Sequence, residues 1–331
     1  MLLLNAENVR TALPMKEAIE AMRHAFVALT EGRVDAPARA HIDIDQHDGV
    51  TLVMPALLKD DDSSALAVKV VSLFEGNHAK GLARIQASVL MFEPDTGRPM
   101  ALLDGAELTA IRTGAASGLA TEYMSRPESK SVAMFGAGVQ ARTQLEAVRA
   151  VRKIEKVAIY SPIPGEADVM VAELLADTSD GSFTPRVAES PADALSDADI
   201  VCTATVSPTP VFEDAMLRPG THINAIGSYK PHVAEIPPET VVRARVVVDQ
   251  HEAAMEEAGD LIQPVEAGLM TWNHIAADLG ELALGRCPGR TSPDEITFFK
   301  SVGNAVQDAS AASTAYKNAV EQGLGFKYEG M

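Results

Sequence analysis

The sequence predicts an α/β protein with two domains, a Rossmann domain and a discontinuous α+β domain. Three observations support this prediction. The chain has 331 residues, more than one typical domain. An apolar run at Val132–Phe135 breaks into a glycine-containing turn and then continues with the apolar spacing of a helix. Further apolar runs that read as parallel strands follow at Lys156–Tyr160, Ile200–Ala204, Thr221–Ile226 and Ala244–Val248.

The N-terminal part predicts one helix followed by an antiparallel sheet. Met15–Leu29 carries its apolar residues on one helical face, and Gly32 fits a C-cap. The turn at Pro94–Gly97 folds one strand back onto the next. The expected strands are Ala38–Ile44, Gly49–Met54, Ala65–Phe74, Ala83–Phe92 and Pro99–Leu103.

The remaining elements set the expected domain boundaries. Ala106–Met124 reads as a helix that leads into a Rossmann unit at 126–301. The tail Ser292–Leu324 reads as helical, with Ser292 as N-cap and Pro293 at the first helical position. We expect this tail to return to the N-terminal domain, which would then comprise 1–125 and 302–331.

The turn after Phe135 has the spacing of a dinucleotide-binding loop. Gly136 makes the tight turn, Gly138 lets the backbone approach a pyrophosphate, and Ala141 is the small residue where helix and strand pack closely. The pyrophosphate would lie at the positive N-terminus of the following helix. The expected cofactor-binding residues, in the turn and at the following strand ends, are Gly136, Ala137, Gly138, Val139, Gln140, Ser161, Thr203, Ala204, Gly227 and Ser228.

The end of the second strand bears on the choice of cofactor. Tyr160 is followed by Ser161 and Pro162, so the Asp or Glu that usually binds the ribose 2′-hydroxyl is absent there. No Arg or Lys replaces it to pair with a 2′-phosphate. We therefore expect NAD and leave NADP open.

Composition excludes several classes of function. The formal net charge of −18 argues against nucleic acid as a partner. No signal peptide and no membrane-spanning run is recognisable, so we expect a cytoplasmic protein without membrane contacts. Cys202 and Cys287 lack metal-site spacing and are expected to be reduced thiols; no metal site is expected.

Three cations stand out in a chain that is short of positive charge. Lys69 lies in an otherwise apolar strand, where it either points to solvent or is buried with a partner. Arg112 lies in a helix of small residues, and Arg39 precedes a strand; each either binds an anion or makes a structural salt bridge. Together the three suggest a carboxylate clamp.

Other polar residues have a structural interpretation as the simpler one. Helix-surface or capping roles are expected of Asp104, Glu107, Lys300 and Asp308, the last two placed on the final helix. His41 and His232 could contact substrate, although an isolated histidine is usually structural. Glu256, Glu257 and Asp260 read as a solvated helix end.

Taken together, these motifs resemble the ornithine cyclodeaminase and mu-crystallin family over essentially the whole chain. The joint match is far more specific than any single motif. The segments that carry it are Met54–Ala56, Lys69–Phe74, Asp95–Ala101, Arg112–Ala115, Gly136–Ala141, Ile223–Gly227, Gly259–Leu261 and Ser301–Asp308.

The resemblance implies a Rossmann domain and a substrate-binding domain that forms a homodimer. It also implies that Arg39, Lys69 and Arg112 hold the substrate α-carboxylate. We expect His41 and Tyr229 as further substrate-binding residues. Family activities include ornithine or lysine cyclodeamination, alanine dehydrogenation, and reduction of cyclic ketimines or open-chain imino acids.

Two departures from the cyclodeaminase pattern narrow these activities. Leu52 and Val53 stand where cyclodeaminases carry a Glu for the distal amine, and Tyr229 replaces an Asp two residues after Gly227. The segment from Gly227 to Pro231 is closer to the ketimine reductase branch.

We therefore expect an NAD(P)H-dependent oxidoreductase that reduces a small α-imino acid to the L-amino acid. Candidate substrates are iminosuccinate and a cyclic ketimine such as pyrroline-2-carboxylate. Lys69 and Arg112 are the expected catalytic residues. The alternatives are an alanine dehydrogenase, an ornithine cyclodeaminase and a non-enzymatic binding protein like mu-crystallin.

Overall fold

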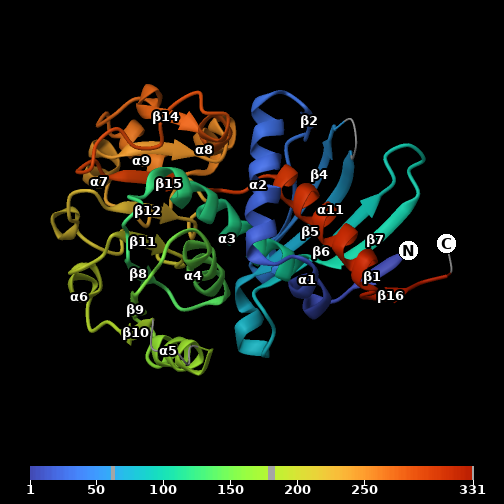
Figure 1. Ribbon diagram of the computed structural model, residues 1–331, viewed down its shortest axis with the longest axis horizontal. Helices are drawn as coiled ribbons and strands as arrows, with labels where there is room; N and C mark the ends of the chain where they lie inside the picture. Colours follow the sequence, from blue (N-terminus) through green and yellow to red (C-terminus); the bar gives the residue numbers. More distant parts are fainter. Residues whose placement is uncertain (61–63, 178–182, 330–331) are drawn as a thin grey trace. The chain divides into compact units, whose positions relative to one another are not determined.

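The computed structural model describes residues 1–60, 64–177 and 183–329, which form two compact units (Figure 1). The first unit comprises Met1–Arg112 and Asn304–Met331, and the second comprises Thr113–Gly303. The sequence placed these boundaries after 125 and after 301; the structure places the first one inside helix α3 (Gly105–Met124). No helix among the described residues is long and apolar enough to cross a membrane.

The sheet of the first unit is mainly antiparallel, as predicted. Its strand order is β16–β1–β7–β6–β5–β4–β2, with β3 also paired to β4; among the described strands of this sheet, β1 and β7 alone pair in parallel. The strands are β1 (Leu2–Leu4), β2 (Val34–Asp35), β3 (Ala40–Ile44), β4 (Gly49–Leu58), β5 (Ala65–Phe74), β6 (Ile85–Phe92), β7 (Pro99–Asp104) and β16 (Phe326–Lys327).

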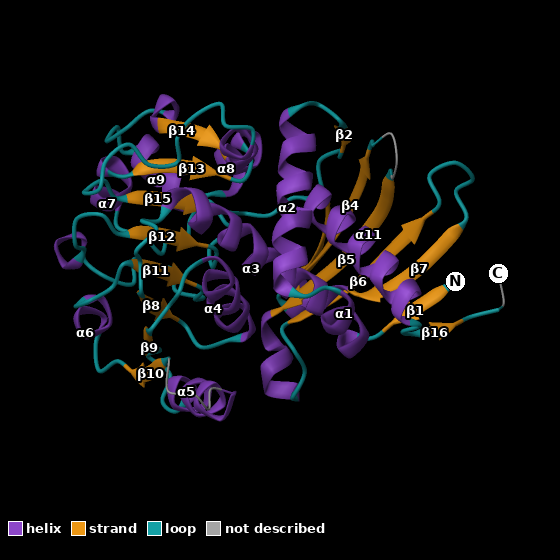
Figure 2. Cartoon of the chain, viewed as in Figure 1, coloured by secondary structure: helices purple, strands orange, loops and turns teal. Residues whose placement is uncertain are grey.

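Helices cover one face of this sheet (Figure 2). They are α1 (Ala6–Ala12), α2 (Met15–Thr30) and α11 (Ala305–Gln322), and α11 packs on α2, β4 and β5. Helix α2 buries the predicted apolar face and ends before Gly32, whose φ of 71° is the left-handed conformation expected of a C-cap glycine. Along β5 every second residue is buried, so the face that holds Lys69 is the one under the helices.

The second unit is a Rossmann fold with a fully parallel sheet of order β10–β9–β8–β11–β12–β15–β13–β14. Its strands are β8 (Ser131–Phe135), β9 (Lys156–Tyr160), β10 (Thr184–Val187), β11 (Ile200–Thr203), β12 (His222–Ala225), β13 (Arg245–Val248), β14 (Ile275–Asp278) and β15 (Thr297–Lys300). Its helices, beside α3, are α4 (Val139–Val151), α5 (Glu166–Asp177), α6 (Pro191–Leu195), α7 (Pro238–Arg243), α8 (His251–Glu257), α9 (Gly259–Glu266) and α10 (Leu279–Ala283).

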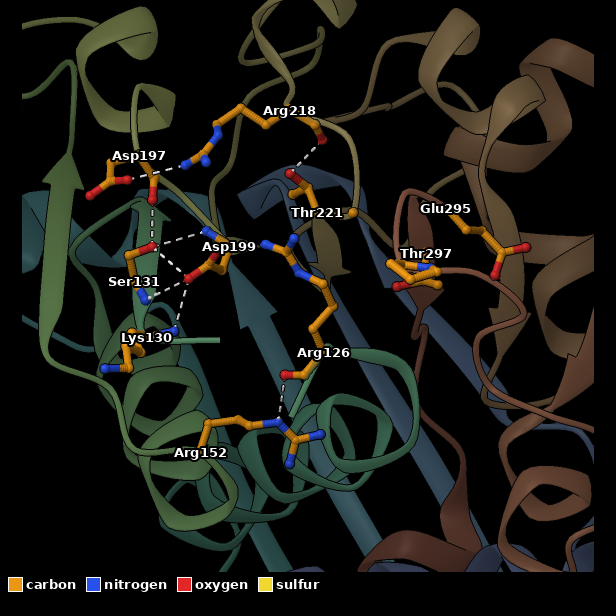
Figure 3. Close-up of polar contacts among 12 residues, drawn as sticks. Arg126, Lys130, Ser131, Arg152, Asp197, Asp199, Arg218, Thr221, Glu295 and Thr297 are labelled. Atoms are coloured by element: carbon orange, nitrogen blue, oxygen red, sulfur yellow. Dashed lines mark hydrogen bonds and ion pairs between the residues drawn. The ribbon is translucent and has the colours of Figure 1, made fainter. Parts of the chain in front are cut away.

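Polar contacts tie the amino ends of the central strands together (Figure 3). The Asp199 carboxylate, just before β11, accepts hydrogen bonds from Lys130 N at 2.8 Å and from Ser131 Oγ at 3.0 Å at the start of β8. It also accepts one from Arg126 Nη2 at 2.6 Å. The Asp199 carboxylate therefore joins the start of β8 to the start of β11.

The predicted helix over Ser292–Leu324 is wrong in its first half. The segment around Ser292 and Pro293 is a turn, Thr297–Lys300 is the buried central strand β15, and the helix begins only at Ala305. Local capping signals were outweighed by burial of Phe298 and Phe299 between β12 and β13. The short strands β1, β2, β10, β14 and β16 were not predicted, because runs this short carry little periodicity.

Candidate functional site

The glycine turn of the second unit has the geometry that its spacing predicted. Gly136 has a φ of 96°, and a Cβ there would lie 2.5 Å from the carbonyl oxygen of Ala204. The residue must therefore be glycine for two reasons, backbone conformation and space. Its N–H donates to Tyr160 O at 2.9 Å, which fixes the turn against the end of β9.

Gly138 is glycine for a different reason. It is the N-cap of α4, no side chain caps that helix end, and a Cβ on Gly138 would meet nothing within 4 Å. The protein itself does not require a glycine here, so the open space in front of uncapped N–H groups suits a phosphate. Ala141 is fully buried, as expected of the small residue where α4 packs on the sheet. The turn thus fits a dinucleotide.

Arg142 is a residue of this turn that sequence reasoning missed. Its Nη1 donates to the carbonyl oxygens of Ala137 at 2.5 Å and Gly138 at 3.2 Å, and its Nη2 lies 2.6 Å from Glu173. A guanidinium held on the turn adds positive charge where a pyrophosphate would bind. An arginine one residue after the third small position was the available signal.

The ends of β11 and β12 are joined by one buried carboxylate. Glu235 is fully buried, and its Oε1 accepts from Thr205 N at 2.8 Å and Thr205 Oγ1 at 2.7 Å. Its Oε2 accepts from Gly227 N at 2.8 Å, Ser228 N at 3.2 Å and Thr203 Oγ1 at 3.1 Å. Burial raises the pKa of Glu235, while the charge of Lys300 opposes the shift. Glu235 therefore fixes the backbone of the strand ends predicted to contact the dinucleotide.

Lys300 and Asp260 are not surface charges, which corrects two predictions. Lys300 ends β15 instead of lying on the last helix, and both side chains are fully buried with Nζ 2.6 Å from Asp260 Oδ2. Lys300 Nζ also donates to Ser228 O at 2.6 Å and Ser228 Oγ at 2.9 Å. Asp260 Oδ1 accepts from the N–H groups of Glu235 and Ile236. We call Ser228, Glu235, Asp260 and Lys300 the closed network.

An acidic residue does lie beside the end of β9, although the position after Tyr160 is Ser161. The Ser161 Oγ donates to Glu166 Oε2 at 2.8 Å and accepts from Ile163 N at 3.2 Å. Glu166 is exposed at the start of α5. The sequence prediction considered only the residues directly after β9. Glu166 lies five residues further along the chain than Ser161, and the loop between them brings its carboxylate back to the end of β9.

Two of the three predicted cations of the first unit, Lys69 and Arg112, meet at a buried carboxylate. Lys69 Nζ lies 2.6 Å from Asp308 Oδ2, and Arg112 Nε donates to Asp308 Oδ1 at 3.1 Å. Arg112 Nη1 donates to Gln307 Oε1 at 3.0 Å, and the same oxygen accepts from Asn304 N at 2.9 Å. Lys69 is 2% exposed and Arg112 is 6% exposed. We call Lys69, Arg112, Gln307 and Asp308 the cationic cluster.

The cluster carries more positive than negative charge. Burial lowers the pKa of Lys69 to about 8, Asp308 opposes this shift, and the charges of Arg112 and Arg39 add to it. In the sheet, Ala40 of β3 pairs with Val53 of β4, and Met54, the next residue of β4, pairs with Lys69 of β5. Arg39 directly precedes Ala40, so it lies near Met54. The pairing therefore brings Arg39 toward Lys69, with β4 between them.

The structure corrects the expected role of Asp308 and places the other predicted residues. Asp308 is 1% exposed and holds both cations, so it is not a helix-surface charge. Asp104 does cap α3, by accepting from Glu107 N at 2.9 Å. His41 is exposed on β3, and no hydrogen bond or ion pair joins it to Lys69 in the part of the chain that the structure describes. Tyr229 belongs to the second unit and is partly buried.

Leu52 is 5% exposed on the helix-covered face of β4. It lies on the same face as Met54, the neighbour of Lys69 across the sheet. The position at which the resemblance implies a carboxylate in cyclodeaminases is therefore apolar and buried in this chain. Cys202 and Cys287 are free thiols, and no metal-binding group of His, Cys, Asp or Glu occurs in the described part of the chain.

Comparison with known proteins gives a whole-chain match. The model of the ornithine cyclodeaminase/mu-crystallin family matches residues 1–323. A Δ1-pyrroline-2-carboxylate reductase of Bacillus cereus is 37% identical over 330 residues, covering 99% of this chain and 100% of that protein.

Solved structures agree with this match. The Δ1-pyrroline-2-carboxylate reductase of Thermococcus litoralis, in complex with NADH and L-proline, is 42% identical with a TM-score of 0.94, covering 99% of this chain and 100% of that one. An archaeal alanine dehydrogenase dimer with bound NAD is 33% identical with a TM-score of 0.90, covering 99% of each chain.

Proposed function

The chain is a member of the ornithine cyclodeaminase/mu-crystallin family, and from this premise we propose that it reduces a small cyclic ketimine carboxylate to the L-amino acid with NADH. A Δ1-pyrroline-2-carboxylate is the substrate that its relatives favour. The observation that carries the proposal is the cationic cluster, in which two buried cations share one carboxylate. Such a surplus of positive charge suits a substrate carboxylate.

The residues of the chain divide the work of this reaction. Arg112 and Arg39 bind the carboxylate and orient the imine, because a guanidinium forms paired hydrogen bonds with a carboxylate. Lys69 donates a proton at the imine nitrogen, and its pKa of about 8 lies close enough to neutrality for this role. NADH, when bound at the glycine turn, supplies the hydride. Gly138, Ala137 and Arg142 would hold its pyrophosphate.

Two other residues, Leu52 and Tyr229, disfavour cyclodeamination. Leu52 leaves the distal ammonium of ornithine without a partner in an apolar position. Tyr229 offers a phenol in place of a carboxylate, and a phenol is a poor general base near neutral pH. Alanine dehydrogenation is the second candidate, because an archaeal alanine dehydrogenase is 33% identical.

A homodimer is part of the proposal. The face of the antiparallel sheet that lies away from the helices carries exposed apolar side chains, and Val70 and Leu102 on it are 41% and 37% exposed. Val68 and Leu90 pair across β5 and β6 on the same face. The related alanine dehydrogenase is a dimer. A cytoplasmic location is also proposed, supported by the two reduced thiols.

One panel of assays tests the proposal. NADH and NADPH oxidation would be followed with Δ1-pyrroline-2-carboxylate, Δ1-piperideine-2-carboxylate, oxaloacetate plus ammonia, and pyruvate plus ammonia. With ornithine and NAD, the release of proline and ammonia would be followed, because cyclodeamination produces no net NADH. We expect the highest kcat/KM with NADH and a cyclic ketimine. A faster reaction with pyruvate plus ammonia would establish the alanine dehydrogenase, and no turnover with any substrate would indicate a binding protein.

A further inference from the structure

Helix α11 begins with an amide whose orientation is fixed by its neighbours. Gln307 Oε1 accepts from Arg112 Nη1 and from Asn304 N, at 3.0 and 2.9 Å. The reverse amide orientation would place an NH2 group against two donors, so the oxygen must face them. Nε2 is bonded to the same carbon and therefore lies beside the Arg112 guanidinium. It is buried and has no hydrogen-bond partner in the described part of the chain.

Asn304 presents a second donor of the same kind. It is the N-cap of α11, and its Oδ1 accepts from Gln307 N at 3.4 Å, which leaves Nδ2 for another partner. Nδ2 is buried and finds no acceptor among residues 1–60, 64–177 and 183–329. Asn304 is 8% exposed and Gln307 is fully buried. Buried donors are normally satisfied, so two adjacent ones indicate an acceptor that the chain does not supply.

The charges around these donors identify the acceptor as an anion. Lys69 and Arg112 are balanced only by Asp308 among the members of the cationic cluster. The two amides also lie at the positive end of an 18-residue helix. We propose that Asn304 Nδ2 and Gln307 Nε2 donate to the substrate carboxylate beside Arg112, as a neutral part of its binding site. This inference rests on the proposed function.

The two residues differ in what else they do, and this decides which one to change. Gln307 also orients Arg112, so its loss would disturb the guanidinium as well as remove a donor. Asn304 only caps α11. Serine and aspartate both cap helices well, so Asn304→Ser and Asn304→Asp keep the cap and change only the group offered to the ligand.

The experiment is isothermal titration of the full-length protein with L-proline, pyruvate and acetate in the presence of NAD, and with NADH alone. We expect Asn304→Ser to weaken carboxylate binding about 10-fold, as for loss of a hydrogen bond to a charged group. Asn304→Asp should weaken it further, because its carboxylate repels the ligand. NADH affinity should not change.

A matched control comes from the same unit. Asn5 is the N-cap of α1 in an equivalent capping box, and it is exposed. Asn5→Ser should alter the melting temperature as little as Asn304→Ser does and should leave carboxylate binding unchanged.

Each remaining outcome is decisive. If Asn304→Ser weakens NADH binding but not carboxylate binding, the acceptor belongs to the dinucleotide and the inference is wrong. It is also wrong if both affinities are unchanged or if wild-type protein binds no carboxylate. If carboxylates bind and Asn304→Asp abolishes binding, but no imine is reduced, then only the proposed function fails.

Discussion

Each unit of the molecule contains a buried lysine–aspartate pair, and the two pairs are used differently. Lys69–Asp308 and Lys300–Asp260 have the same Nζ–Oδ2 separation of 2.6 Å and are equally inaccessible to solvent. In the closed network, Lys300 has three acceptors, which is every hydrogen bond an ammonium can donate. Among the described residues, Lys69 has one ion-pair partner, Asp308, and it shares that partner with Arg112.

The surplus charge is also opposite in the two places. The closed network has two carboxylates, Glu235 and Asp260, for one cation, and their oxygens are occupied by backbone N–H groups and hydroxyls. The cationic cluster has more positive charge than Asp308 can balance. We call Lys300–Asp260 the closed pair, because all of its hydrogen-bond donors are used and it holds the backbone in place. We call Lys69–Asp308 the open pair, because its positive charge is not fully balanced and it is suited to bind an anionic ligand.

The largest expected effect separates the two lysines by stability. Lys300→Met leaves the Asp260 carboxylate buried without its cation, so we expect a loss of about 3–5 kcal/mol in the free energy of unfolding. Lys69→Met should cost less, because Asp308 keeps its hydrogen bond with Arg112. Melting temperatures of the two variants, measured with and without NAD, test this difference. Equal decreases in melting temperature for Lys300→Met and Lys69→Met would contradict the distinction between the closed pair and the open pair.

The second prediction concerns substrate binding by the open pair. Arg112→Met should lower kcat/KM at least about 30-fold, because loss of a buried charge-assisted contact costs about 2–5 kcal/mol. The Kd for NADH should stay within about twofold of wild type, an allowance near 0.4 kcal/mol. Arg10→Met is the control, since Arg10 makes a partly exposed salt bridge to Glu107 in the same unit. Wild-type turnover in Arg112→Met would make Arg112 structural.

Sequence reasoning found what depends on local pattern. Periodicity located β5 with its correct ends, and Lys69 drew notice because an ammonium inside an apolar strand needs a partner. The partner itself, Asp308, was read as a surface charge because it lies at the other end of the chain. Asp260 and Lys300 were misread for the same reason. Which distant charges meet is decided by tertiary packing, and no local pattern records it.

The third prediction is a pH effect specific to the open pair. The pKa of Lys69 is lowered to about 8, so the ammonium is lost as pH rises above that value and kcat/KM should fall, by about tenfold per pH unit. In Lys69→Arg, kcat/KM should be lower at every pH because arginine is a poor proton donor, and the remaining activity should not decline over this range because arginine stays protonated. An unchanged decline in that variant would assign the titration to another group.

Stability should change in the opposite direction over the same range. An unfolded lysine titrates near its ordinary value of 10.5, so between about pH 8 and 10.5 the unfolded chain binds more protons than the folded one. The contribution of Lys69 to stability therefore rises with pH in this window while activity falls. Chemical unfolding of wild type and Lys69→Met at pH 7.5 and 9.5 would separate this contribution from that of other groups.

The smallest expected effect concerns Glu166, a carboxylate of the second unit that we expect to act on a bound cofactor. Glu166 is exposed and is held beside the end of β9 by Ser161, where a 2′-phosphate of NADP would carry its charge. Glu166→Gln should therefore improve the affinity for NADPH about fivefold, the scale of one exposed charge interaction, while that for NADH changes less. The gain should shrink in high salt, because exposed charges are screened.

Glu173→Gln is the matched control. It removes the ion-pair partner of Arg142 at the glycine turn, next to the pyrophosphate that both cofactors share. It should therefore change the affinities for NADH and NADPH alike. If Glu166→Gln and Glu173→Gln changed the ratio of NADPH affinity to NADH affinity equally, Glu166 would be acting on the shared pyrophosphate. It would then not discriminate between a 2′-phosphate and a 2′-hydroxyl.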